Sequence, residues 1–146
     1  MKEKESPFDK SLVGVEKARV RFNETDPLGI VWHGHYIVYF EDGREAFGRQ
    51  HGLTYLDIQN SGFTTPIVKT NTEHFLPLRY GETFTIETTY INSTAAKLIY
   101  QYKIFNYEGK LACSGETTQV FLDGDGNLCL YAPAFFQDWK EKMGLS

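Results

Sequence analysis

Residues 23–36 of this chain place a carboxylate close to the start of a helical segment. Asp26 lies in a turn marked by Pro27 and Gly29, and a short apolar run separates this turn from a segment that becomes helical at about residues 33–36. The first N–H groups of a helix have no acceptor inside the helix, and the helix dipole adds positive charge there. Such a helix end can hold a developing oxyanion while the carboxylate attacks as a nucleophile or activates water. An Asx-type turn at the Asp-Pro pair is the structural alternative.

The elements that must position this carboxylate are a strand before it and a helix after it. Residues 16–22 alternate charged and apolar side chains, and a period of two predicts a half-buried strand. Residues 36–50 carry apolar side chains three and four positions apart, which is typical of one helix face. His51 and Gly52 are typical of a helix end. Because Gly43 costs about 1 kcal/mol of helix propensity, we expect it to mark a close contact between helix and sheet.

The rest of the chain is predicted to be mostly β-structure. One or two helical turns are expected at residues 53–60, and Pro133 is expected to begin a short C-terminal helix. The order of a strand, a long helix and then four strands predicts an α+β domain whose antiparallel sheet wraps one long central helix. We expect a flexible arm at residues 1–14 and a single domain at residues 15–146. The four later strands are predicted at residues 67–76, 83–92, 97–107 and 110–122.

Composition and charge narrow the class of protein. A chain of 146 residues with 41% hydrophobic and 15% aromatic residues is expected to fold as one globular domain. The net charge of −4 gives no reason to expect nucleic acid as a partner. The N-terminus lacks the apolar region of a signal peptide, and no apolar run approaches bilayer length, so we expect a cytoplasmic protein. Cys113 and Cys129 match no metal or redox spacing and are expected to be free thiols.

The residues around Asp26 form a longer pattern, which consists of residues 25–33 (Thr-Asp-Pro-Leu-Gly-Ile-Val-Trp-His) followed by Tyr36, Glu41 and Arg44. This pattern resembles the signature of hotdog-fold acyl-CoA thioesterases of the 4-hydroxybenzoyl-CoA thioesterase and YbgC-like family. The resemblance implies a hotdog fold and hydrolysis of an acyl-CoA thioester to a carboxylate and CoA. In that family the aspartate is either a nucleophile that forms an acyl-enzyme anhydride or a general base for water. Both roles are open for Asp26.

The same resemblance implies roles for other residues. The backbone N–H of His33, with Gly34 beside it, matches the group that points at the thioester oxygen, whereas a packed imidazole is the alternative role for His33. Glu41 either orients groups in the site or lies on a solvated helix face. Tyr36 is a candidate for substrate contact, although we expect it mainly to pack the helix on the sheet. Further candidates for contact with CoA, each otherwise a surface residue, are Lys69, Thr70, Asn71, Arg79 and Lys97.

Neither a metal nor a diffusible cofactor is expected. His33 and His35 are only two histidines without a cysteine cluster, which is weak support for a metal pair. Residues 123–127 resemble a calcium loop only briefly, because the later positions lack the required glycine and glutamate, and a hairpin turn is the better interpretation. CoA would enter the reaction as part of the substrate.

Subunits of the resembling family pair edge to edge, with their active sites at the dimer interface. We therefore expect a homodimer or a homotetramer, which would also cover an exposed sheet edge. The alternative function is a non-catalytic module that binds acyl-CoA or acyl-carrier protein on the same fold, and a dehydratase is a third possibility. The acyl group, and the choice between CoA and acyl-carrier protein, stay open.

Overall fold

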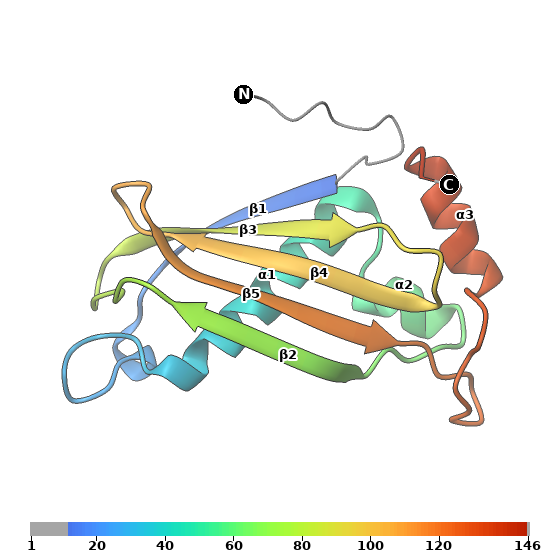
Figure 1. Cartoon of the computed structure of the whole chain (residues 1–146), viewed down its shortest axis with the longest axis horizontal. Helices are drawn as coiled ribbons and strands as arrows, with labels where there is room; N and C mark the ends of the chain where they lie inside the picture. The colour runs from blue at the N-terminus through green and yellow to red at the C-terminus, as the bar shows by residue number, and fades with distance from the viewer. Residues whose placement is uncertain (1–11, 146) are drawn as a thin grey trace.

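The computed structural model describes residues 12–145 as one antiparallel sheet with helix α1 (Tyr36–His51) across one face (Figure 1). The strand order is β1-β3-β4-β5-β2, and every pair of neighbours is antiparallel. The predicted α+β arrangement is therefore confirmed, with a central helix of 16 residues. The strands are β1 (Leu12–Arg19), β2 (Ile67–His74), β3 (Thr83–Ile91), β4 (Lys97–Phe105) and β5 (Leu111–Val120), and the shorter helices are η1 (Phe22–Glu24), η2 (His33–His35), α2 (Tyr55–Asn60) and α3 (Ala134–Lys142).

Strand β1 differs from the prediction at both ends. It begins at Leu12, inside the region predicted to be an arm, and ends at Arg19 instead of continuing to Phe22. Pairing with β3 sets the C-terminal limit, since Arg19 lies opposite Thr83, the first residue of β3. Phe22 instead begins the 3-10 helix η1 and is exposed. The remainder of the predicted arm, residues 1–11, lies outside the described residues.

Helix α1 packs on the sheet through an aromatic face. Tyr36, Tyr39, Phe40 and Phe47 are all buried on this face, as the periodicity of three and four residues predicted. Phe40 stacks on Tyr102 of β4 with 4.4 Å between the ring centroids. Burial of these rings supplies much of the apolar driving force that holds the helix on the sheet.

Gly43 is a point of close approach between α1 and the sheet, as predicted. A Cβ atom at this position would lie 2.4 Å from Oγ1 of Thr88 and 2.8 Å from Cγ2 of Ile86. We expect Gly43→Ala to destabilise the protein by about 1–3 kcal/mol through overpacking, which outweighs the better helix propensity of alanine. Chemical denaturation measures this change. Gly124→Ala is the control, because its Cβ would meet nothing nearer than 3.9 Å, and a stabilised Gly43→Ala variant would contradict the close contact.

The two shorter α-helices lie near the C-terminal end of α1. Thr54 caps α2 by accepting the backbone N–H of Asp57 at 3.1 Å, and Gly52 ends α1 with φ 74°. Trp139 of α3 donates its indole N–H to the carbonyl oxygen of His51 at 2.7 Å. These contacts confirm the predicted helix end at Gly52 and the predicted C-terminal helix.

The two edges of the sheet differ in how their backbone groups are satisfied. At the β1 edge, Gln50 accepts the N–H of Val15 at 3.0 Å and donates to its carbonyl oxygen at 2.8 Å. Nε2 of His51 lies 2.8 Å from the carbonyl oxygen of Val13. At the other edge, β2 is exposed along almost its whole length, and the side chain of Val68 is 59% exposed. Because open strand edges pair with other chains, β2 is the edge available for association.

Candidate active site

Asp26 lies on a tight hairpin between η1 and η2. Its backbone N–H donates to the carbonyl oxygen of Ile30 at 2.9 Å, and the N–H of Gly29 donates to the carbonyl oxygen of Asp26 at 2.9 Å. The sequence Asp-Pro-Leu-Gly has the preferred residues for a type I turn, and Gly29 adopts φ 75°, which favours glycine. A bridge between Thr25 and Val31 closes the hairpin below these residues. Local sequence therefore determines the turn that presents Asp26.

The Asp26 carboxylate uses one oxygen for structure. Oδ1 accepts the backbone N–H of Leu28 at 2.8 Å, which is the Asx-type turn expected as the structural alternative. Among the described residues, none donates a hydrogen bond to Oδ2. Asp26 is partly exposed. The turn and a chemical role are therefore compatible, because the turn fixes the carboxylate while one oxygen stays available to a ligand.

Two backbone N–H groups at the helix start are also available. Trp32 precedes η2 in extended conformation, and α1 follows η2 directly. Within the described part of the chain, the N–H groups of His33 and Gly34 donate to no acceptor. A Cβ at Gly34 would lie 2.4 Å from the Trp32 ring, so a larger residue would displace that ring. Among the described residues, the helix start thus has two backbone N–H groups that donate to no acceptor.

The side chains of His33 and His35 have different environments. The His33 ring is exposed, lies 5.2 Å from the Trp32 ring and forms no hydrogen bond with another described residue. His35 is the packed imidazole, with its ring 4.8 Å from the Tyr39 ring and edge-on to it. The sequence analysis considered His35 only as a weakly supported metal ligand.

Backbone hydrogen bonds join the hairpin to the segment between β2 and β3. Val31 donates its N–H to the carbonyl oxygen of Leu78 at 2.8 Å, and Tyr80 donates to the carbonyl oxygen of Gly29 at 3.1 Å. Arg79 forms an isolated bridge with Ile30. Arg79 is therefore the basic candidate that the structure brings beside the Asp26 hairpin.

The other predicted contacts lie elsewhere in the chain. Lys97 pairs with Val120 and Lys69 with Thr118, which places both lysines toward the sheet end remote from the hairpin. Glu41 is exposed on α1 and lines a separate pocket of about 330 Å³. Within one chain, these residues do not converge on Asp26. Thr70 and Asn71 lie on the exposed edge strand β2.

Tyr36 has a structural environment. It is buried at the start of α1, and its ring meets the His74 ring edge-on at 4.9 Å between centroids. Burial raises the pKa of Tyr36 to about 12, so the hydroxyl stays protonated at neutral pH. These contacts agree with the expectation that Tyr36 mainly packs the helix on the sheet.

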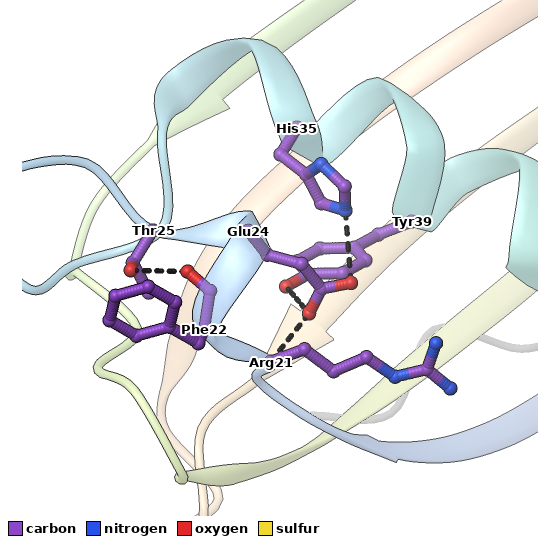
Figure 2. Close-up of polar contacts among 6 residues, drawn as sticks. All are labelled: Arg21, Phe22, Glu24, Thr25, His35 and Tyr39. Atoms are coloured by element: carbon purple, nitrogen blue, oxygen red, sulfur yellow. Dashed lines mark hydrogen bonds and ion pairs between the residues drawn. The ribbon is translucent and has the colours of Figure 1, made fainter.

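Sequence reasoning missed a polar cluster around Glu24, shown in Figure 2. Oε1 of Glu24 accepts the backbone N–H of Arg21 at 2.7 Å and the hydroxyl of Tyr39 at 3.0 Å. Oε2 lies 3.1 Å from Nε2 of His35. The Glu24 side chain is only 13% exposed. Two features of the sequence could have indicated this cluster. Glu24 stands next to the Thr25-Asp26 pair, and His35 and Tyr39 are four residues apart, a spacing that puts two side chains on the same face of a helix.

Three other features concern metal-binding groups, membrane spans and cysteines. The described residues contain no group of three metal-binding side chains that could hold an ion. None of their helices is both long enough and apolar enough to cross a bilayer. Cys113 and Cys129 are both free, as predicted.

Comparison with known proteins defines the class of this protein. A family model described as the thioesterase-like superfamily matches residues 20–140. The chain belongs to this superfamily, and it is a hotdog-fold thioesterase. The predicted resemblance and fold are therefore confirmed.

Individual relatives support this assignment. The Bacillus subtilis (strain 168) protein provisionally named acyl-CoA thioesterase YneP is 32% identical over 127 residues, which cover 87% of this chain and 92% of YneP. The acyl-CoA thioester hydrolase YbgC of Escherichia coli O157:H7 is 25% identical, over 72% of this chain and 78% of YbgC. Among solved structures, the DHNA-CoA thioesterase from Staphylococcus aureus has a TM-score of 0.82 and 26% identity, covering 90% of this chain and 89% of that one.

Proposed function

We propose that the protein hydrolyses acyl-CoA thioesters to a free carboxylate and CoA, with Asp26 as the reacting carboxylate. The observation that carries this proposal is the Asp26 carboxylate on a hydrogen-bonded hairpin, with Oδ2 accepting no hydrogen bond from the described residues. The same segment leads into a helix start where the N–H groups of His33 and Gly34 donate to no described acceptor. The names of YneP and YbgC support CoA thioesters as the substrate class. Thiol release from a panel of acyl-CoA thioesters tests the proposal.

The proposed reaction has two possible routes. Asp26 either attacks the thioester carbonyl carbon, so that the C–S bond breaks, the CoA thiolate leaves and water then hydrolyses the resulting anhydride, or it removes a proton from the water that attacks this carbon and displaces the thiolate. In both routes the N–H groups of His33 and Gly34 stabilise the tetrahedral oxyanion, a contribution of about 3 kcal/mol per donor in comparable sites. Turnover in water labelled with oxygen-18 tests for the anhydride route, because label found in Asp26 requires water to have attacked the Asp26 carbonyl carbon of an anhydride. No diffusible cofactor takes part in either route.

Binding of CoA is proposed to use basic residues around the site. Arg79 is the best placed of the predicted candidates, because its backbone pairs with Ile30 of the Asp26 hairpin. An arginine can pair with a phosphate through two parallel hydrogen bonds. Lys69, Thr70 and Asn71 lie on the free β2 edge, so we assign them to a site completed by a second subunit.

The protein is proposed to form a homodimer through strand β2. The β1 edge is occupied by Gln50 and His51, whereas no described segment pairs with the outer side of β2, which carries exposed apolar side chains. A two-fold axis beside β2 would pair the two copies of this strand and continue the sheet across both subunits. A cytoplasmic location and further association to a tetramer stay predictions.

Sedimentation velocity at micromolar concentration is expected to give twice the chain mass of 16.8 kDa, or four times if dimers associate. Val68→Lys should shift the protein toward monomer, because it replaces an exposed apolar side chain on the β2 edge with a charged one that pairing would have to accommodate. Val15→Lys is the matched control, since Val15 is exposed on the closed β1 edge and should leave the mass unchanged. A wild-type protein that sediments as a monomer would contradict the proposed dimer.

A further inference from the structure

Glu24 links the segments on both sides of the Asp26 hairpin. Its backbone carbonyl oxygen accepts the N–H of Trp32 at 3.0 Å, which closes the base of the hairpin immediately before η2. Its carboxylate contacts His35, the last residue of η2, and Tyr39 in the first turns of α1. One residue therefore connects the strand side of the hairpin to the helix start that carries the free N–H groups.

We propose that Glu24 is a positioning residue, which holds the Asp26 hairpin in place relative to the N–H groups of His33 and Gly34 through its hydrogen bonds to His35 and Tyr39. This inference rests on the proposed function of Asp26. Glu24 acts through these neighbours and does not touch the reacting atoms. A displacement of about 1 Å between reacting groups can cost about 100-fold in rate, so a residue that fixes this geometry contributes to turnover.

The environment of Glu24 suits this role. Its carboxylate is nearly buried and accepts hydrogen bonds from Arg21 N–H and Tyr39, with His35 completing the set. Burial, followed by the hydrogen bond to Glu24, raises the pKa of Tyr39, so its hydroxyl stays a donor at neutral pH. Of the other charged groups packed nearby, Asp42 of α1 has a raised pKa, caused mainly by burial. A buried carboxylate with several donors is held more rigidly than an exposed one.

Glu24→Ala tests the proposal directly. Purified variants are assayed for thiol release on the acyl-CoA that wild type turns over best. We expect kcat to fall about 100-fold while KM changes less than about threefold, because the variant misplaces the reacting groups but keeps the substrate contacts. Glu24→Gln should restore kcat to within about fivefold of wild type. Its amide oxygen can accept from Arg21 and Tyr39, while its amide nitrogen donates to His35 in the tautomer that leaves Nε2 unprotonated.

Glu16→Ala is the matched control. Glu16 lines the same surface pocket of about 850 Å³ as Glu24, but it pairs with Arg49 at 3.2 Å and forms no hydrogen bond or ion pair with the described hairpin residues. This variant should keep wild-type kcat and KM. Tyr39→Phe removes one hydrogen bond from Glu24 without removing a ring, and we expect an intermediate loss of kcat of about tenfold. If Glu24→Ala does not fold, the kcat of Tyr39→Phe alone tests the positioning role of Glu24.

The outcomes separate this inference from the proposed function. If Asp26→Asn is inactive but folded Glu24→Ala and Tyr39→Phe both retain wild-type kcat, the positioning role is wrong and the proposed function stands. If Asp26→Asn retains turnover, the proposed function is wrong whatever Glu24 does. A loss of kcat in Glu24→Ala that Glu24→Gln does not restore would also contradict the positioning role. Loss in Glu24→Ala with recovery in Glu24→Gln supports it.

Discussion

Asp26→Asn is expected to lower kcat for acyl-CoA hydrolysis by at least about a thousandfold, as removal of a reacting group does in other hydrolases. The asparagine oxygen can still accept the N–H of Leu28, so the hairpin should keep its shape. The amide has no anionic oxygen and can neither form the anhydride nor accept a proton from water. Thiol release, followed with a chromogenic disulfide reagent on short, long and aromatic acyl-CoA thioesters, measures the loss.

The matched control for this variant is Asp57→Asn. Asp57 also accepts a local backbone N–H, from Thr54 at 2.8 Å, but it lies in α2 rather than in the hairpin. This control should keep full activity, and thermal unfolding should show that both variants are folded. Turnover by Asp26→Asn at the wild-type rate would rule out the assigned role. A wild-type protein that turns over no thioester in the panel would favour acyl-carrier protein as substrate, or the non-catalytic binding module.

Phe47→Ala is expected to destabilise the protein by about 3–5 kcal/mol, which is the usual cost of removing a fully buried phenylalanine. Phe47 is 0% exposed and lies where α1, the sheet and α3 meet. Its ring lies 5.3 Å from the Tyr100 ring and 6.3 Å from the Trp139 ring. Because single domains are stable by only about 5–15 kcal/mol, the variant should unfold at much lower urea concentration.

Phe22→Ala makes the same chemical change on the surface. The Phe22 side chain is 78% exposed, with an edge-on contact to Tyr80 at 5.8 Å. We expect a loss of no more than about 1 kcal/mol, the size of an aromatic pair contact. Urea unfolding of both variants provides the comparison. Equal losses at the two positions would show that burial of Phe47 in the α1 interface is not the source of its contribution.

Much of the fold could be predicted because its helix and strands have strong periodic patterns. The spacing of Tyr36, Phe40, Gly43 and Phe47 predicted both the helix and the face that it buries. The ends of β1 were predicted less well, because a strand ends where its partner stops pairing and not where its own alternation stops. The alternation of residues 16–22 therefore gave the right element with the wrong limits.

The candidate site was predictable in part. The Asp-Pro-Leu-Gly sequence indicated a turn, and the structure has that turn with Asp26 at its first position. The roles of His33 and His35 were not predictable, since both residues lie in the same short segment and only packing decides which ring turns inward. Glu24 was missed because its partners His35 and Tyr39 lie 11 and 15 residues away.

The local features of this protein, namely the hairpin of Asp26, the amphipathic helix and the alternating strands, follow from short stretches of its sequence. These features depend on turn preference and on side-chain period, which act over a few residues. Packing of distant segments was needed for Gln50 to cover the β1 edge, for β2 to be left without a described pairing partner on its outer side, and for Glu24 to join the hairpin to the helix start. These contacts join residues distant in sequence, and they form only when α1 packs on the sheet and buries its aromatic face.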